Sequence, residues 1–379
     1  MNRRLNKKKI ILIICIVLII ALVVTLSVLY QNNVQVRLFL DEYVFRKNIT
    51  ENTLPKISTD NSHSFVFNDH IVCLDKNVLT FYNKSANKVD SIDVEISDPL
   101  FATNGKYLCI AEKNGSKIYL ISGKNVVWQK DVEGQISNLS LNKNGYVAVS
   151  ISGTTYTTVC RVYDENGNDL FTNYLSKSYV IDSAISNDNK FLALAETNFS
   201  GIAIQSNIKI ISIDKALTNS SDTIQYSYSA PIGDFVINIE YSANDDLVCL
   251  YDNHIDIVKD NSVSEITSFN NSNILFADIN NKLIQIEKRN TGMLSSEFEL
   301  QIIDISTLER KVYALDKEPK SLEVFGNVIA VNFGTEVLFI NNSGWLIKNY
   351  TSSQEIQSII LSNNLAGIVF NDKVEILDL

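Results

Sequence analysis

The chain has 379 residues, which suits one large domain or two ordinary ones, and 45% are hydrophobic, enough for a packed core. Residues 1–30 contain five basic groups and no acidic group, which leaves 28 basic against 43 acidic groups in the remainder, a net charge of −15. Such an acidic body excludes general nucleic-acid binding, because phosphate contacts need Lys and Arg.

The first element is an apolar run from Ile10 to Tyr30, IILIICIVLIIALVVTLSVLY, with no charged or amide side chain. As a helix its 21 residues would span roughly 31 Å, the thickness of a bilayer core. The run is longer than the apolar part of a signal peptide, and no A-x-A-like cleavage site follows it. It therefore predicts an uncleaved transmembrane signal-anchor helix over residues 10–30.

The orientation of this helix follows from its flanks. The basic residues of segment 1–9 precede it, and basic flanks stay in the cytoplasm. We expect a single-pass protein of the cell membrane with a cytoplasmic N-terminus and everything from Gln31 onward outside. A signal sensor would then need a partner inside the membrane, since nine or so cytoplasmic residues leave no room for an output domain.

Residues 31–62 form a juxtamembrane connector. Val34–Phe45 mixes apolar and charged residues and suits a short helix or a strand; as a helix it would place Val36, Phe39, Leu40 and Val44 on one face. The following segment, residues 48–60, is polar and contains Pro55, which is typical of a connector.

A repeated hairpin organises residues 63–379. It is clearest in Ser137–Leu175, which predicts strands over 138–141, 146–152, 157–163 and 170–175. Asn-Gly turns separate the strands, and Asn-Gly supplies the positive φ angles of tight hairpins. The turn with its second strand recurs about eight times, starting at Asn68, Asn104, Asn144, Asp188, Asn244, Asn280, Gly326 and Asn363.

A unit of about 40 residues with four strands is the spacing of a propeller blade. The sequence therefore predicts an all-β fold, a β-propeller of eight blades over residues 63–379, with seven as the alternative. The last unit stops after its third strand, at Leu377, so a strand from elsewhere must close the ring. The connector 31–62 is the natural donor. The long gaps at 216–223 and after Glu287 are expected to be polar surface loops.

No catalytic signature is present. The three His residues, His63, His70 and His254, share no metal-ligand spacing, and we expect surface or turn roles for the last two. Asp164–Asp169 resembles half a calcium loop but lacks the sixth-position Gly and the closing Glu, so we expect a hairpin turn. We therefore expect no catalytic, cofactor-binding or metal-binding residues, and no cofactor.

The cysteine and tryptophan positions suit core packing. Cys73, Cys109 and Cys249 occupy the same place in three second strands, too far apart for disulfides, while Cys160 lies in a third strand. These thiols are expected to behave as small core hydrophobes. Trp128 and Trp345 lie near turns that lead to fourth strands, and we expect them to pack in the core.

Several segments resemble an uncharacterised family of single-span bacterial proteins with an outward quinoprotein-like or WD40-like propeller. They are residues 41–47 (DEYVFRK), 142–147 (NKNGYV), 185–190 (ISNDNK), 343–346 (SGWL) and 350–355 (YTSSQE). The resemblance covers nearly the whole chain and implies the architecture, but no site residues. The wider superfamily includes envelope assembly scaffolds and quinone-dependent dehydrogenases. The adjacent-cysteine pair of those dehydrogenases has no counterpart here.

These observations favour a membrane-anchored, extracytoplasmic propeller that binds a partner and performs no chemistry. The expected partners are the membrane, through residues 10–30, and another cell-envelope protein or a glycan, but no nucleic acid. The alternative is an extracytoplasmic enzyme of quinoprotein-like or hydrolase type, because propellers can build a site from loops distant in sequence.

Overall fold

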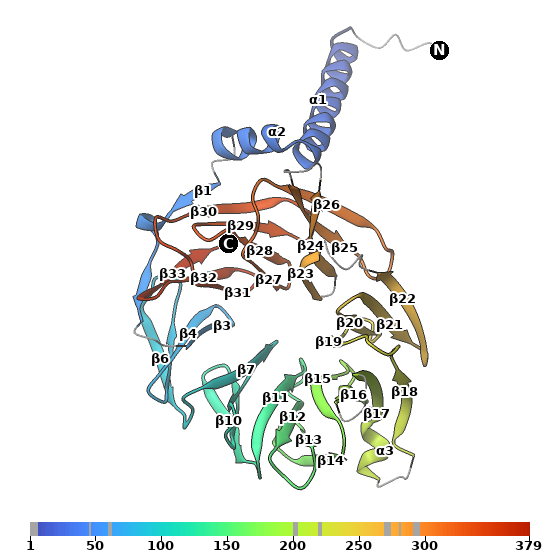
Figure 1. The fold of residues 1–379 in the computed structure, drawn as a ribbon. Coiled ribbons are helices and arrows are strands. Elements are labelled where there is room, and N and C mark those ends of the chain that lie inside the picture. The colour runs from blue at the N-terminus through green and yellow to red at the C-terminus, as the bar shows by residue number, and fades with distance from the viewer. Residues whose placement is uncertain are drawn as a thin grey trace, which may run out of the picture.

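The computed structural model describes residues 7–44, 47–59, 63–199, 204–218, 222–268, 274–279, 282–290 and 296–379. They form a closed ring of eight antiparallel sheets, with a long helix projecting from its rim (Figure 1). The predicted eight-bladed all-β propeller is confirmed, and the seven-bladed alternative is wrong. Each blade takes its four strands in order from the centre of the ring outward, except that the last blade borrows one.

Blades 1 to 4 are built from consecutive strands. Blade 1 contains β3 (His63–Phe67), β4 (His70–Asp75), β5 (Val78–Tyr82) and β6 (Lys88–Asp93), and blade 2 contains β7 (Pro99–Asn104), β8 (Tyr107–Glu112), β9 (Lys117–Ser122) and β10 (Asn125–Asp131). Blade 3 contains β11 (Gln135–Leu141), β12 (Val147–Ser152), β13 (Thr158–Tyr163) and β14 (Asp169–Leu175). Blade 4 contains β15 (Tyr179–Ile185), β16 (Phe191–Asn198), β17 (Gln205–Ser212) and β18 (Ile224–Ser229).

Blades 5 to 8 complete the ring. Blade 5 contains β19 (Val236–Tyr241), β20 (Leu247–Tyr251), β21 (His254–Lys259) and β22 (Ser262–Ser268), and blade 6 contains β23 (Ile274–Ile279), β24 (Leu283–Asn290), β25 (Ser296–Ile303) and β26 (Arg310–Leu315). Blade 7 contains β27 (Ser321–Phe325), β28 (Val328–Asn332), β29 (Glu336–Asn341) and β30 (Leu346–Thr351). Blade 8 contains β31 (Ser358–Leu361), β32 (Leu365–Val369) and β33 (Lys373–Asp378).

The second strands form the core between blades. Strands such as β20 and β28 are buried at every position, because both faces of the sheet contact a neighbouring blade. The turns before these strands need left-handed backbone: Gly145 has φ +89° and Asn189 has φ +63°. At Gly145 a Cβ would lie 2.8 Å from the Tyr107 ring of blade 2, so this turn also packs against the neighbouring blade.

The connector closes the ring. Its strand β2 (Lys56–Ser58) pairs antiparallel with β33 and supplies the missing outer strand of blade 8. Ile57 is 5% exposed and packs in a cluster with residues of blades 8 and 1, among them Val374 and Ile71. A further strand, β1 (Asn48–Thr50), pairs parallel with β30 and gives blade 7 a fifth strand. The chain therefore crosses two blades before it begins the first one.

Helix α1 (Lys7–Asn32) extends outward from the rim beside blades 6 and 7 (Figure 1). Its segment Leu12–Tyr30 is long and apolar enough to cross a membrane, and apart from Tyr30 at its end the segment is not buried against the propeller. The base of the helix is docked: the Tyr30 ring stacks on Trp345 at 5.1 Å, and its hydroxyl donates to Asp41 at 2.8 Å. Trp345 therefore contacts the helix, and it also packs against the apolar cluster that blades 6 and 7 share.

The segment after α1 turns back along the rim as α2 (Val34–Phe39) and a single π-helical turn, Leu40–Val44. The expected apolar helix face is not the buried one: Phe39 and Val44 are 58% and 57% exposed, whereas Arg37 and Asp41 are 2% and 4% exposed. The Arg37 guanidinium lies 3.7 Å from the centre of the Tyr313 ring, which satisfies the cation by a cation–π contact. The face that docks on the propeller is therefore the one that carries Arg37 and Asp41, because these side chains find partners in Tyr313 and Tyr30.

The two expected loops are shorter than predicted. In the first, α3 (Ile213–Leu217) already begins before residue 216, and residues 219–221 lie outside the described residues. In the second, β24 and β25 continue to Asn290 and from Ser296, and residues 291–295 lie outside the described residues. β24 and β25 stay paired through this region, for example at Lys288 and Phe298, so the hairpin extends into the segment that was expected to be a loop.

Candidate functional site

The two histidines singled out at strand starts differ in environment. His70 begins β4 and is half-buried, and burial lowers its pKa. His254 begins β21 but is 8% exposed, so the expected surface role is wrong for it. Its ring stacks on Tyr251 at 4.3 Å, and its Nε2 lies 3.3 Å from the Asp256 carboxylate. These contacts with Tyr251 of β20 and Asp256 of β21 account for the burial of the His254 ring.

The cysteines, Trp128 and the Asp164 turn, which the sequence analysis also considered, have structural roles. Cys73, Cys109, Cys160 and Cys249 are all buried and free, as expected. Trp128 packs against Tyr163 of the next blade, with ring centroids 5.7 Å apart. The Asp164 turn is a hairpin in which the carboxylate accepts from backbone N–H groups of the turn itself, so no oxygen is left arranged for calcium.

A central channel runs between the innermost strands, and β-bulges shape its wall. In blades 3, 4 and 5 a bulge in the first strand is followed by Asn138, Asp182 and Asn238 at equivalent register positions. Asn238 Nδ2 and the N–H of Ile239 both donate to the Asp182 carboxylate at 2.9 Å. Asn138 Nδ2 donates to the carbonyl of Ile181 at 3.3 Å. After each bulge, one polar side chain is placed where it can form a hydrogen bond with the adjacent blade. These hydrogen bonds connect blades 3, 4 and 5.

Four consecutive innermost strands each carry a carboxyl group, of which Asp182 and Glu240 line the channel pocket and Asp278 and Glu323 follow on the next two strands. Burial, together with the negative charges of Asp278 and Asp182, raises the pKa of Glu240 to about 8. Burial and the charge of Asp278 raise the pKa of Glu323 to about 7. Burial also raises the pKa of Asp182 to about 6, against the lowering effect of its hydrogen-bond donors, and raises the pKa of Asp278.

The channel therefore holds protons at neutral pH. A cation that entered it would stabilise the ionised carboxylates and displace those protons. The channel pocket has a volume of about 550 Å³ and is bounded by innermost strands of blades 2 to 5 and by Val324 of blade 7. Among the described residues, no group of three or more His, Cys, Asp or Glu side chains is arranged to hold a metal ion.

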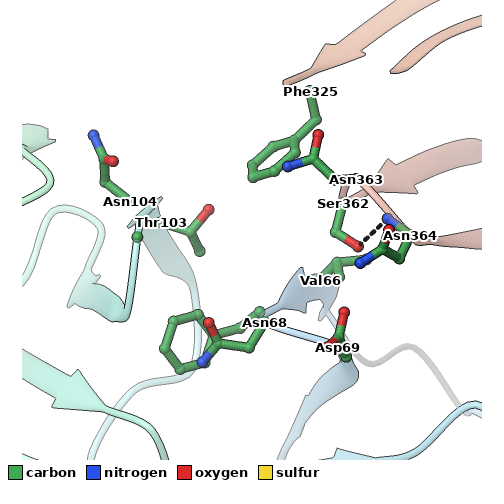
Figure 2. A pocket seen from close by; sticks show the side chains of 11 residues that line it. Val66, Asn68, Asp69, Thr103, Asn104, Phe325, Ser362, Asn363 and Asn364 are labelled. Atoms are coloured by element: carbon green, nitrogen blue, oxygen red, sulfur yellow. Dashed lines mark hydrogen bonds between the residues drawn. The ribbon is translucent and has the colours of Figure 1, made fainter. Parts of the chain in front are cut away.

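The channel opens toward a polar recess at the face that carries the turns between first and second strands, here called the turn face. This recess has a volume of about 270 Å³ and adjoins the channel at Thr103 and Asn104. Figure 2 shows its side chains coming from four blades: Asn68 and Asp69 from blade 1, Asn104 from blade 2, Phe325 from blade 7, and Asn364 with its neighbours from blade 8. Amides, hydroxyls and one carboxylate dominate, so the recess suits a ligand that exchanges hydrogen bonds.

Elsewhere on the turn face the amides join blades to one another. Asn142 Nδ2 donates to the Ser186 carbonyl at 3.0 Å, and Asn187 Nδ2 donates to the Ser242 carbonyl at 2.9 Å. The many Asn residues of the chain therefore serve both turn geometry and blade-to-blade contact. The recess is the place where the turns of blades 8, 1 and 2 stand far enough apart to leave space.

The channel carboxylates were not predicted from the sequence. Each stands alone in an otherwise ordinary strand pattern, so no local motif marks it. A signal does exist in the repeat register: Glu240 and Asp278 occupy the same position, opposite Val248 and Ile284 in the second strands of their blades. Superposing the repeats would have shown an acidic residue at that position in two adjacent units.

Comparison with known proteins supplies the family. The model of a family of unknown function, DUF5711, matches residues 41–379. The chain belongs to this family. The matched region begins at Asp41, within the last turn of the docked rim segment, and includes both closing strands and all eight blades. No curated protein matches the sequence.

Solved structures with a similar fold share little sequence with this family member. The C-terminal WD40 domain of Sif2 is 13% identical with a TM-score of 0.57, over 85% of this chain and 97% of that one. Sqt1 of Chaetomium thermophilum, bound to the N-terminus of ribosomal protein L10, is 10% identical with a TM-score of 0.54, over 88% and 100%. The dihydro-heme d1 dehydrogenase NirN is 10% identical with a TM-score of 0.54, over 86% and 75%. These likenesses establish the propeller fold.

Proposed function

We propose that this protein is a membrane-anchored, extracytoplasmic scaffold whose propeller binds a partner in the cell envelope and performs no chemistry. The observation that carries the proposal is the dock between α1 and the ring. Tyr30, the last residue of the apolar segment, is 2% exposed and is held by Trp345 and Asp41. A propeller fixed in this way to a membrane helix is presented at a set height and orientation, which suits recruitment of another molecule at the membrane.

The orientation of the ring supports this role. Because α1 leaves from the rim (Figure 1), a helix that crosses the membrane would stand the ring on edge, with both faces open to the sides. The basic residues before the helix favour a cytoplasmic N-terminus and therefore an outward propeller. A structure of the same fold, that of Sqt1, is bound to the N-terminus of another protein. A protein segment from the envelope is accordingly the partner that we favour over a glycan.

Photo-crosslinking of the full-length protein in its native membrane tests this function. A photoreactive amino acid is placed at Lys143 on the turn face, at Ile232 on the opposite face, or at Val89 on the outer strand of blade 1; all three side chains are exposed. A binding scaffold should yield an adduct of discrete mass from at least one face position and none from Val89. Equal, diffuse adducts from all three positions, or no adduct from any of them, would contradict the proposal.

An extracytoplasmic enzyme is the second candidate, and the channel carboxylates favour it. Glu323, with a pKa raised to about 7, and Glu240, with a pKa raised to about 8, have values typical of acid–base groups at neutral pH. Assay of the purified full-length protein against ester, amide and glycoside model substrates, and an absorption spectrum for a bound quinone, separate the candidates. Turnover that is lost in Glu323→Gln would favour the enzyme.

A further inference from the structure

An apolar patch lies on the face opposite the turn face, here called the loop face, over blades 4 and 5. It consists of Tyr179, Phe199, Ile204 and Ile232, which are 49%, 48%, 43% and 74% exposed. The Tyr179 and Phe199 rings are 5.8 Å apart, and the N–H of Gly233 donates to the Ile204 carbonyl at 3.5 Å. Asn198 and Gln205 pair at the end of β16 and β17, which brings Phe199 and Ile204 together and joins the two halves of the patch. Exposed apolar groups gathered in this way are typical of a protein-binding surface.

The most exposed member of the patch is displayed by a tight turn. The N–H of Asp234 donates to the Pro231 carbonyl at 3.2 Å, and Gly233 has φ +101°, the left-handed conformation that such a turn requires. Ile232 is thereby held outward at the tip. A flexible loop could fold this side chain against the protein, whereas the closed turn keeps it in solvent.

An acidic pocket of about 420 Å³ adjoins the patch, between the outer strand of blade 4 and blade 5. Asp234 follows the displayed Ile232 and lines the pocket together with His254, Asp256 and Glu265. The side chains of Asp234 and Asp256 are 16% and 5% exposed, and Glu265 stands exposed at the outer strand. No Lys or Arg is among the described residues that line the pocket. His254, whose ring nitrogens lie 3.9 Å from the Asp234 carboxylate and 3.3 Å from the Asp256 carboxylate, is the one basic side chain among the described lining residues, so the three carboxyl groups outnumber it.

A buried hydroxyl beside this pocket also has no hydrogen-bond partner. Tyr251 is 1% exposed, stacks face to face on His254, and its Oη makes no hydrogen bond within the described protein. Burial raises the pKa of Tyr251, and the neighbouring thiol of Cys249 and the charge of Asp256 add to this effect. Through this stack Tyr251 holds the His254 ring at the wall of the pocket.

We propose that the patch and the pocket together bind a segment of a partner protein in which an arginine is flanked by apolar residues. The guanidinium would enter the pocket, where Asp234, Asp256 and Glu265 supply carboxylates and Tyr228 supplies an aromatic face. The apolar neighbours would cover Ile232 and the Tyr179–Phe199 pair. This inference rests on the proposed scaffold function and names its binding surface and the chemistry of its partner.

The test uses the full-length protein in its native membrane with the photoreactive amino acid at Ile232. We expect an adduct whose crosslinked partner peptide, identified by mass spectrometry, contains Arg or Lys within three residues of the attachment point. Glu265→Lys should lower the adduct yield at least fivefold, because it places a cation at the pocket. The matched control is Asp90→Lys, the same charge change on an exposed outer strand of blade 1, which should leave the yield unchanged.

The outcomes separate this inference from the scaffold function. Adducts that form at Lys143 but not at Ile232 would overturn the loop-face site and leave the scaffold standing. The same holds for an Ile232 adduct whose peptide carries no basic residue, for a glycan or lipid adduct, and for a yield that Glu265→Lys and Asp90→Lys change equally. Asp234→Asn, which keeps the turn and its hydrogen bond to Asn253, should lower the yield in the same direction as Glu265→Lys.

Discussion

Replacing Ile57 with aspartate is expected to open the ring between blades 8 and 1. Ile57 lies on the short strand that completes blade 8, and it packs in one cluster with Val374 of blade 8 and Ile71 of blade 1. An aspartate there would place an unpaired charge in that core, which costs about 3–5 kcal/mol of folding free energy. β2 has only three residues, so we expect it to detach from β33, which would return the aspartate to solvent.

Denaturant unfolding and limited proteolysis of the full-length protein in detergent measure this effect. Ile57→Asp should lower the unfolding midpoint and expose the connector and blade 8 to cleavage first. The matched control is Ser58→Asp, the same new side chain one residue later on the exposed face, opposite Lys373. It should behave like the wild type. An Ile57→Asp variant with wild-type stability and cleavage would show that the ring does not depend on this closure.

Replacing Glu240 with glutamine is expected to stabilise the protein at alkaline pH and to have little effect at pH 4. The folded-state pKa of Glu240 is raised to about 8, above its unfolded value. Between these two values the unfolded state loses the proton and the folded state keeps it, so Glu240 lowers stability as pH rises. Above the folded pKa the full penalty persists. Glutamine removes the ionisation and with it the penalty.

The expected gain for Glu240→Gln at pH 9 is about 2 kcal/mol, since each pKa unit is worth about 1.4 kcal/mol and solvent in the channel reduces the effect. Unfolding free energies at pH 4 and pH 9 provide the measurement. Glu133→Gln, at an exposed loop position, is the control and should change neither value. A Glu240→Gln variant that matches the wild type at both pH values would mean that this carboxyl group is fully solvated.

The blades could be predicted from the sequence because their signals are local. Each Asn-containing turn indicates a hairpin. The apolar run of each second strand, such as Phe191–Asn198, indicates that the strand is buried on both faces. The need for a closing strand followed from the chain end at blade 8. Its origin in the connector 31–62 was also predicted and is confirmed, whereas its residues were not predicted, because a three-residue strand such as Lys56–Ser58 carries too little pattern to be recognised alone.

The docked rim and the channel depend on contacts distant in sequence. Arg37 and Asp41 are charged and one helical turn apart, which locally indicates a solvated face; only Tyr313 and Tyr30 make that face the buried one. His254 is buried for a similar reason, because Tyr251 and Asp256 flank it in the folded hairpin. In each case the partner that reverses the local expectation becomes visible only in three dimensions.

The central claim is that the closed propeller stands outside the cell on a single membrane helix, and labelling of Ser85→Cys tests it most directly. Ser85 is exposed in a turn of blade 1, whereas the four native cysteines of the propeller are buried and Cys15 lies within the apolar helix. A maleimide that cannot cross membranes should label Ser85→Cys in intact cells and leave the wild type unlabelled. Labelling that appears only after the cells are broken would place the propeller in the cytosol and contradict the account.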